Sequence, residues 1–200
     1  MPTIPAHAIG GVITGWGTAL PSKIVTNEDL SKTMETSDEW IRERTGIHRR
    51  HIGGSTAELS VESGRIAMLM AGVSPDQIDA LVLSTTTPDR QVHATSATVQ
   101  NLLGLKCGAF DINAACSGFV YGLVVAHGLI AMGSKKVLLI GTDTLSRITD
   151  WTDRNTAILF ADGSGAAVIE ATTGPTQLLG WDLDADGSAE ELLYAEIGGN

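Results

Sequence analysis

One cysteine lies where a nucleophile could be activated. Residues 111–119, Asp-Ile-Asn-Ala-Ala-Cys-Ser-Gly-Phe, place Cys116 between a β-prone run and a long apolar run. We expect a strand and then a helix, with Ser117 and Gly118 allowing a tight turn between them. The positive end of a helix stabilises a thiolate by roughly 0.3 to 2 kcal/mol, and backbone N–H groups at such a turn point toward an oxyanion. Cys116 is therefore a candidate acyl-carrying nucleophile.

Local pattern alone does not decide between this role and a structural one. Cysteine is among the most buried residue types, and by that argument a core position for Cys116 is the stronger interpretation. Cys107 lies in a Lys-Cys-Gly loop with no helical run after it, so we expect a structural residue there. Two cysteines in a chain of 200 residues favour free thiols in a reducing compartment.

A second candidate site combines cations with an aromatic ring. Four arginines and two histidines gather close together: Arg42, Arg44, Arg49, Arg50, His48 and His51. Trp40 and Arg44 are four residues apart on a predicted helix, so they share a face. A nucleotide can stack on such a ring and pair its phosphate with such a cation. A solvated basic face with Trp40 in the core is an equal alternative from this segment alone.

Alternating helices and strands must position these residues. Capping boxes predict helices that open at Thr26, Thr36 and Ser55. A compact apolar run predicts a strand covered on both faces at residues 80–86, and further strands are predicted at residues 109–113, 136–142 and 166–171, the last after a Gly-rich turn at 162–165. Helical spacing of apolar residues occurs at 66–73, 99–103 and 118–132. Helices between strands indicate a parallel sheet with helical layers on both sides.

Composition excludes several classes of protein. The apolar content and 23 glycines predict one sizeable α/β core. A formal net charge of −10 argues against nucleic-acid binding and against a membrane-surface role. The apolar run at 118–132 is too short to span a bilayer, and the first residues lack a secretory signal. We therefore expect a cytoplasmic protein with no nucleic-acid or membrane partner.

Several segments, in order along the chain, resemble signatures of the β-ketoacyl-acyl carrier protein synthase III family. They are residues 36–41 with 44–47, residues 113–119, residues 152–154 and residues 160–167. The resemblance implies a thiolase-like α/β fold with α/β/α/β/α layers. Residues 1–172 would form its N-terminal half, and residues 173–200 would begin the C-terminal half. It also implies an acyltransferase that moves an acyl group from coenzyme A to Cys116 and condenses it with malonyl-acyl carrier protein after decarboxylation.

The resemblance implies roles for individual residues. Cys116 is the nucleophile, and its own backbone N–H is one of two oxyanion donors. Trp40 and Arg154 sandwich the adenine ring of coenzyme A. Three further positions line the path of the coenzyme, namely Thr36, Arg44 and Thr45. Acyl-coenzyme A is a substrate here, and no cofactor or metal is implied.

The acyl pocket follows from the same resemblance. Leu159 and Phe160 match positions near the acyl tunnel, and Val92 matches a site where a partner subunit closes that tunnel. Straight-chain enzymes of the family carry a bulky aromatic residue at the position of Val92, so we expect a pocket larger than acetyl requires, with a shifted loop as an equal alternative. A homodimer acting in fatty-acid or polyketide initiation is implied.

The family also needs a histidine and an asparagine in its C-terminal half. The sequence stops at Asn200, before either, and none of its five histidines stands in a matching segment. We therefore expect a fragment that cannot complete condensation by itself and that exposes an apolar face.

Other functions fit the sequence less well. A dinucleotide-binding dehydrogenase is suggested by Gly15-Trp-Gly17 and by Gly163-Ser-Gly165, but the third glycine of the fingerprint is missing at both places. A metal site at His48 and His51 lacks further ligands nearby. Another thiolase-superfamily condensing enzyme and a non-catalytic scaffold homologue stay open as alternatives.

Overall fold

The structure, a computed structural model, describes residues 9–174 and 176–195. These residues form two compact units. The first unit comprises residues 9–19, 55–143 and 164–184, and the second comprises residues 20–54, 144–163 and 185–195. The predicted division at residue 172 concerns the two halves of a longer fold and stays a prediction.

The first unit is an α/β structure around a five-stranded sheet. Its elements are β1 (Gly10–Ala19), α3 (Thr56–Ala71), the 3₁₀ turn η1 (Pro75–Gln77), β4 (Ala80–Ser84), α4 (Thr95–Leu102), β5 (Gly108–Ile112), the 3₁₀ turn η2 (Ala115–Ser117), α5 (Gly118–Ala131), β6 (Lys136–Thr144) and β7 (Asp162–Thr172). The strand order is β1-β7-β6-β4-β5. Strand β4 pairs in parallel with β5 and β6, as predicted, whereas β1 and β7 pair antiparallel. The sheet is therefore mixed.

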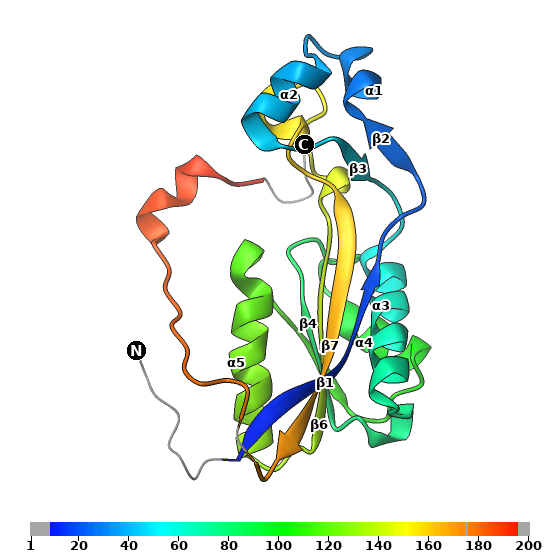
Figure 1. Cartoon of the computed structure of the whole chain (residues 1–200), viewed down its shortest axis with the longest axis vertical. Coiled ribbons are helices and arrows are strands. Elements are labelled where there is room, and N and C mark those ends of the chain that lie inside the picture. Colours follow the sequence, from blue (N-terminus) through cyan, green and yellow to red (C-terminus); the bar gives the residue numbers. More distant parts are fainter. Residues whose placement is uncertain (1–8, 175, 196–200) are drawn as a thin grey trace. The chain divides into compact units, whose positions relative to one another are not determined.

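Helices cover both faces of this sheet, with α3 and α4 on one face and α5 on the other (Figure 1). Successive side chains of a strand point to opposite faces. Leu81 and Leu83 accordingly pack in the core that contains α3 and α4, whereas Val82 packs with Ala126 and Ile130 of α5. This two-sided burial explains why the strand runs lack polar alternation, and it confirms the layered α/β prediction for this unit.

Strand β1 was not among the predicted strands, because glycines interrupt its apolar pattern. Those glycines let β1 lie directly on α3. A Cβ at Gly15 would be 2.4 Å from the backbone oxygen of Ala67, and one at Gly17 would be 2.2 Å from that of Ser63. The predicted turn at 162–165 is wrong for a related reason, since these residues begin β7, and Ser164 and Gly165 pair with the end of β1.

The second unit consists of short elements. They are β2 (Ile24–Thr26), α1 (Asn27–Ser31), α2 (Asp38–Thr45), β3 (Arg49–His51), the 3₁₀ turn η3 (Leu145–Arg147), α6 (Arg154–Ala157) and the 3₁₀ segment η4 (Gly187–Leu192). The capping box at Thr26 is confirmed, as is the one at Ser55 in the first unit. The box at Thr36 is wrong by one residue, because Ser37 is the N-cap of α2 and accepts from the backbone N–H of Trp40.

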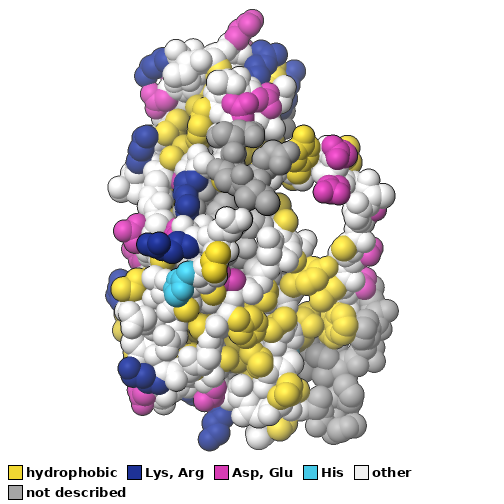
Figure 2. Space-filling model, turned by 180° about the vertical axis from the view of Figure 1, so that it is seen from behind, with side chains coloured by type: hydrophobic (Ala, Val, Ile, Leu, Met, Phe, Trp, Pro, Cys, Tyr) yellow, Lys and Arg dark blue, Asp and Glu magenta, His cyan; other side chains and the backbone are white. Residues whose placement is uncertain are grey.

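Some large apolar side chains of the first unit remain exposed. They include Phe110 on the edge strand β5 and Val120 on α5. The space-filling view shows hydrophobic side chains gathered in the lower half of the face it presents (Figure 2). No helix within the described residues combines the length and the apolar character that a bilayer crossing requires.

Candidate functional site

Cys116 lies at the turn that leads into α5. It occupies the middle of η2, directly before the helix, and its thiol is free and exposed. The preceding Ala115 has φ 45°, the one positive φ of a non-glycine residue in the described chain. Such backbone strain costs of order 1–3 kcal/mol and persists where the surroundings enforce it. Here the Ala115 N–H donates to Oδ1 of Asn113 at 3.1 Å, which holds the turn.

The backbone N–H groups around the thiol have different partners. The Ser117 N–H donates to the carbonyl of Ala114 at 3.1 Å, and the Gly118 N–H donates to that of Ala115. In the part of the chain that the structure describes, the N–H of Cys116 donates to no protein acceptor. The Cys116 N–H can therefore donate to the oxygen of an acyl group that is bonded to the Cys116 sulfur.

The segment that carries Cys116 contacts the end of β4 both before and after the cysteine. Before the cysteine, the carbonyl of Ile112 accepts from the Thr85 N–H at 3.1 Å. After it, Gly118 approaches the side chain of Ser84 so closely that a Cβ there would be 1.9 Å from Oγ. The position of the thiol therefore depends on the conformation of the residues that follow β4.

A carboxylate of β6 fixes those residues. Oδ1 of Asp143 accepts from the backbone N–H groups of Thr86 and Thr87, at 2.8 and 3.2 Å. It also accepts from the hydroxyls of Thr85, Thr86 and Thr87, at 3.2, 2.9 and 2.9 Å. Sequence reasoning missed this cluster, although three consecutive threonines after a buried strand and an acid near the end of another are visible signals.

We expect the Asp143→Asn substitution to lower the free energy of unfolding by about 2 kcal/mol. The amide keeps one oxygen but loses the charge, and hydrogen bonds to charged groups contribute about 1.5–3 kcal/mol. Thermal unfolding should shift downward by roughly 4–8 °C for a chain of this size. Asp186→Asn, in the exposed η4 region, is the control. An Asp143→Asn protein that melts with the parent would contradict this role.

Two arginine side chains lie over the ring of Trp40 in the second unit. The guanidinium carbon of Arg44 lies 4.2 Å from the centroid of the Trp40 ring, and that of Arg154 lies 4.6 Å from it. Arg154 also donates to the carbonyl of Glu35 at 2.7 Å. The i, i+4 pairing of Trp40 with Arg44 is confirmed, and Arg154, far along the chain, joins the same ring.

The spacing between Trp40 and Arg154 matters for the predicted adenine sandwich. A base between two planes needs two contact layers of about 3.5 Å each, or roughly 7 Å in total. At 4.6 Å the two side chains already contact each other. An adenine could enter between them only if the guanidinium moved away from the ring, so the sandwich stays a prediction.

The two threonines expected beside the coenzyme have different environments. The Thr45 hydroxyl donates to the carbonyl of Ile41 at 2.7 Å and accepts from the Ile47 N–H at 3.0 Å, so it supports the end of α2. Oγ1 of Thr36 is buried and has no hydrogen-bond partner among the described residues. Of the two hydroxyls, that of Thr36 is therefore the one with hydrogen-bonding capacity to spare.

Arg50 does not belong with the cations expected to meet an anion. Its side chain is 2% exposed, and it donates to neutral oxygens of Ile158 and Asn27. Burial lowers the pKa of Arg50 from its usual range. Asn27 in turn donates to Asp38 at 2.8 Å, and this bond, followed by that of Arg42, lowers the pKa of Asp38. Within the basic cluster of the sequence, Arg50 is therefore not available to an external anion.

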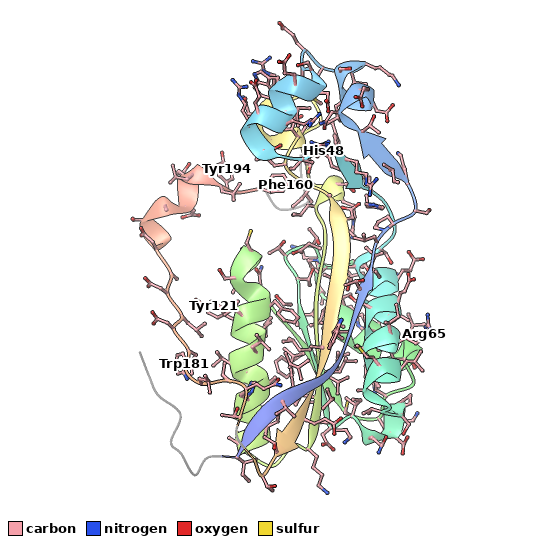
Figure 3. The ribbon with its side chains drawn as sticks, viewed as in Figure 1. His48, Arg65, Tyr121, Phe160, Trp181 and Tyr194 are labelled. Atoms are coloured by element: carbon pink, nitrogen blue, oxygen red, sulfur yellow. The ribbon has the colours of Figure 1, made fainter. Side chains whose placement is uncertain are left out.

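The residues expected at the acyl tunnel lie on both units. Val92 is in the turn between β4 and α4, and its side chain is 98% exposed. Leu159 is exposed, and Phe160, labelled in Figure 3, is half-buried; both follow Ile158, the C-cap of α6. The structure does not determine how the two units sit relative to each other, so their common role stays a prediction.

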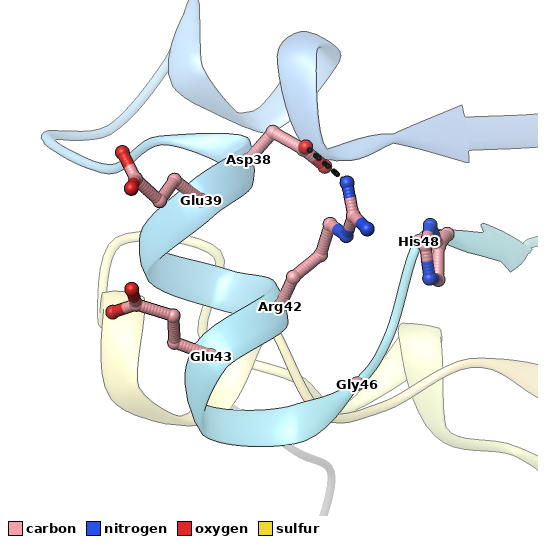
Figure 4. Close-up of a pocket in the computed structure, with 6 residues that line it drawn as sticks. All are labelled: Asp38, Glu39, Arg42, Glu43, Gly46 and His48. Atoms are coloured by element: carbon pink, nitrogen blue, oxygen red, sulfur yellow. Dashed lines mark hydrogen bonds and ion pairs between the residues drawn. The ribbon is translucent and has the colours of Figure 1, made fainter.

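A shallow pocket of about 520 Å³ lies along another part of α2 (Figure 4). It is lined by Asp38, Glu39, Arg42, Glu43, Gly46 and His48. The Arg42 guanidinium pairs with the Asp38 carboxylate at 3.3 Å inside it. Because Arg42 already pairs with Asp38, and Glu39 and Glu43 add negative charge, this pocket has no clear ligand. Burial raises the pKa of Cys107, which disfavours a reactive thiolate there.

Comparisons with known proteins agree with the motifs. Residues 110–187 match the family model of 3-oxoacyl-[acyl-carrier-protein (ACP)] synthase III. The β-ketoacyl-[acyl-carrier-protein] synthase III of Erythrobacter litoralis is 48% identical over 198 residues, and that of Xanthomonas campestris is 50% identical over 191 residues. The alignments cover 95% and 93% of this chain and 62% and 58% of those proteins. The chain therefore spans about three fifths of the length of these relatives.

Solved structures give the same result for the fold. The 3-oxoacyl-[acyl-carrier-protein] synthase III of Aquifex aeolicus superposes with a TM-score of 0.92 at 42% identity, over 95% of this chain and 63% of that one. The priming β-ketosynthase of the R1128 polyketide pathway superposes with a TM-score of 0.81 at 32% identity, over 87% of this chain and 54% of that one. The thiolase-like α/β fold is thus confirmed, and the chain is related in sequence and structure to the 3-oxoacyl-[acyl-carrier-protein] synthase III family.

Proposed function

We propose that this chain is the N-terminal part of an acyltransferase of the synthase III type, with Cys116 as the acyl-carrying residue. The observation that carries the proposal is an exposed thiol next to a backbone N–H that has no protein acceptor in the described chain. Attack of the thiolate on a thioester carbonyl forms a tetrahedral oxyanion, which that N–H can stabilise. Collapse of the intermediate breaks the carbon–sulfur bond of the donor, expels the donor's thiolate and leaves an acyl group on Cys116.

The donor we propose is acyl-coenzyme A. Trp40 and Arg154 offer a ring and a guanidinium plane for the adenine, and Arg44 brings a cation for the phosphates of the coenzyme. Arginine recognises phosphate through paired N–H donors, which a single aromatic face cannot supply. Thr36, whose buried hydroxyl has no hydrogen-bond partner among the described residues, adds a further polar group near the start of α2.

The acceptor and the assembly follow from the relatives. Their printed names contain the acyl carrier protein, which supports malonyl-acyl carrier protein as the second substrate of the whole protein. A homodimer is supported by β5, an edge strand with an exposed Phe110, because uncovered apolar edges favour pairing. Two free thiols suit a reducing compartment, and we therefore place the protein in the cytoplasm.

Intact mass spectrometry after incubation with acetyl-coenzyme A tests the proposal. We expect the protein to gain the mass of one acetyl group, lost again on treatment with hydroxylamine. Cys116→Ala should gain nothing, whereas Cys107→Ala should be labelled like the parent. Labelling that survives in Cys116→Ala would assign the reaction to another residue. An unlabelled parent would favour the non-catalytic scaffold.

A further inference from the structure

Arg50 carries a buried guanidinium that hydrogen-bonds to none of the residues predicted to contact the coenzyme. Nε of Arg50 donates to the carbonyl of Ile158 at 2.9 Å, and Nη2 donates to the same oxygen. Nη1 donates to Oδ1 of Asn27 at 2.9 Å. The guanidinium therefore links two segments that are more than a hundred residues apart in sequence.

The hydrogen bonds from Arg50 to the carbonyl of Ile158 fix the end of α6. This helix is a single turn, with Arg154 as its first residue and Ile158 as its C-cap. Four helical residues span only about 6 Å along the helix axis. Fixing the carbonyl of Ile158 therefore also restricts the side chain of Arg154. Asp153 supports the other end, since its Oδ1 accepts from the Asn155 N–H at 2.9 Å.

The Asn27 contact controls the start of α2. Asn27 is fully buried, and its Nδ2 donates to Oδ1 of Asp38 and to the carbonyl of Ile47, both at 2.8 Å. Asp38 is the first residue of α2, two positions before Trp40, and Ile47 lies just beyond the end of that helix. Asn27 thus holds both ends of the helix that presents the ring.

We propose that Arg50 is a positioning residue that sets the distance between Trp40 and Arg154 and thereby the affinity for the nucleotide part of acyl-coenzyme A. The inference rests on the proposed function of the Trp40 surface. A buried guanidinium is suited to this task, because its planar fork can hold two acceptors in fixed directions. A lysine offers one ammonium and cannot reproduce the fork.

A comparison of two acyl donors tests the inference. Acetyl-coenzyme A carries the nucleotide, whereas S-acetylpantetheine lacks it. The second-order rate of Cys116 acetylation is measured for both by intact mass. We expect Arg50→Met to lower the rate with acetyl-coenzyme A at least tenfold and to leave the rate with S-acetylpantetheine within twofold. Arg50→Lys should lower the first rate about threefold.

Controls separate positioning from general damage. Arg65→Met removes the same charge from an exposed site on α3 and should leave both rates at the parent value (Figure 3). If Arg50→Met does not fold, Arg50→Lys provides the test. Equal losses with both donors, or no selective loss in either Arg50 variant, would overturn the positioning role.

The nucleotide site itself is tested separately. Trp40→Ala and Arg154→Ala should each lower the rate with acetyl-coenzyme A selectively. If they do not, the proposed coenzyme site is wrong. If they do while the Arg50 variants retain the parent preference for acetyl-coenzyme A, only the inference about Arg50 fails.

Discussion

Replacing Gly17 by alanine should leave little folded protein. A Cβ at this position would be 2.2 Å from the backbone oxygen of Ser63 and 2.7 Å from the backbone nitrogen of Ala67. Both atoms belong to α3, a helix of 16 residues, so neither can move without the rest of the helix. Overpacking usually costs 1–3 kcal/mol where side chains can adjust. Against backbone we expect at least about 4 kcal/mol, much of the stability of an ordinary domain.

Urea unfolding and soluble yield measure this effect. Gly165→Ala is the matched control, because Gly165 lies on the partner strand β7 beside Thr18 and no atom lies within 4 Å of its added Cβ. We expect the control to unfold within about 1 kcal/mol of the parent. A Gly17→Ala protein that unfolds at the same urea concentration as the control would show that α3 does not depend on this contact.

The same glycines explain the limits of the sequence prediction for the fold. The apolar run of β4 predicted a strand buried on both faces, because burial leaves a direct mark on composition, and β5, β6 and most of β7 were also predicted as strands. Strand β1 lies so close to α3 that no side chain fits at the contact. Glycines meet this requirement, and they leave no apolar pattern in the sequence. A Gly-x-Gly pair can equally indicate a phosphate loop, so only the position of α3 identifies its purpose here.

The candidate sites show a similar division. The Trp40 and Arg44 pair is local and could be predicted from helical spacing, and Cys116 could be placed at a strand-to-helix turn. Arg50 has the same residue type as its exposed neighbours, so its burial could not be predicted from the basic cluster. Asp143 acts on threonines more than fifty residues away, a distance that no local pattern spans.

Replacing Gly118 by alanine should slow acetylation of Cys116 about 100-fold, or roughly 2.7 kcal/mol in the barrier. Its Cβ would be 1.9 Å from Oγ and 3.3 Å from Cβ of Ser84, which is itself 6% exposed at the end of β4. Because the Ser84 side chain is buried, we expect the start of α5 to move rather than the hydroxyl to rotate, and the thiol two residues earlier to move with it. A displacement near 1 Å at a reacting atom is enough for an effect of this size. The acetylation rate is measured by intact mass with acetyl-coenzyme A.

A second substitution can test whether the clash is the cause. Ser84→Ala removes the hydroxyl and leaves the 3.3 Å contact, which small shifts can relieve. The double variant Gly118→Ala with Ser84→Ala should therefore regain at least tenfold of the lost rate. Gly128→Ala, on the same helix with no atom within 4 Å of the added Cβ, should acetylate at the parent rate. If Gly118→Ala folds and remains slow in the double variant, the contact with Ser84 does not position the thiol. Recovery would establish that the end of β4 determines where Cys116 meets its thioester.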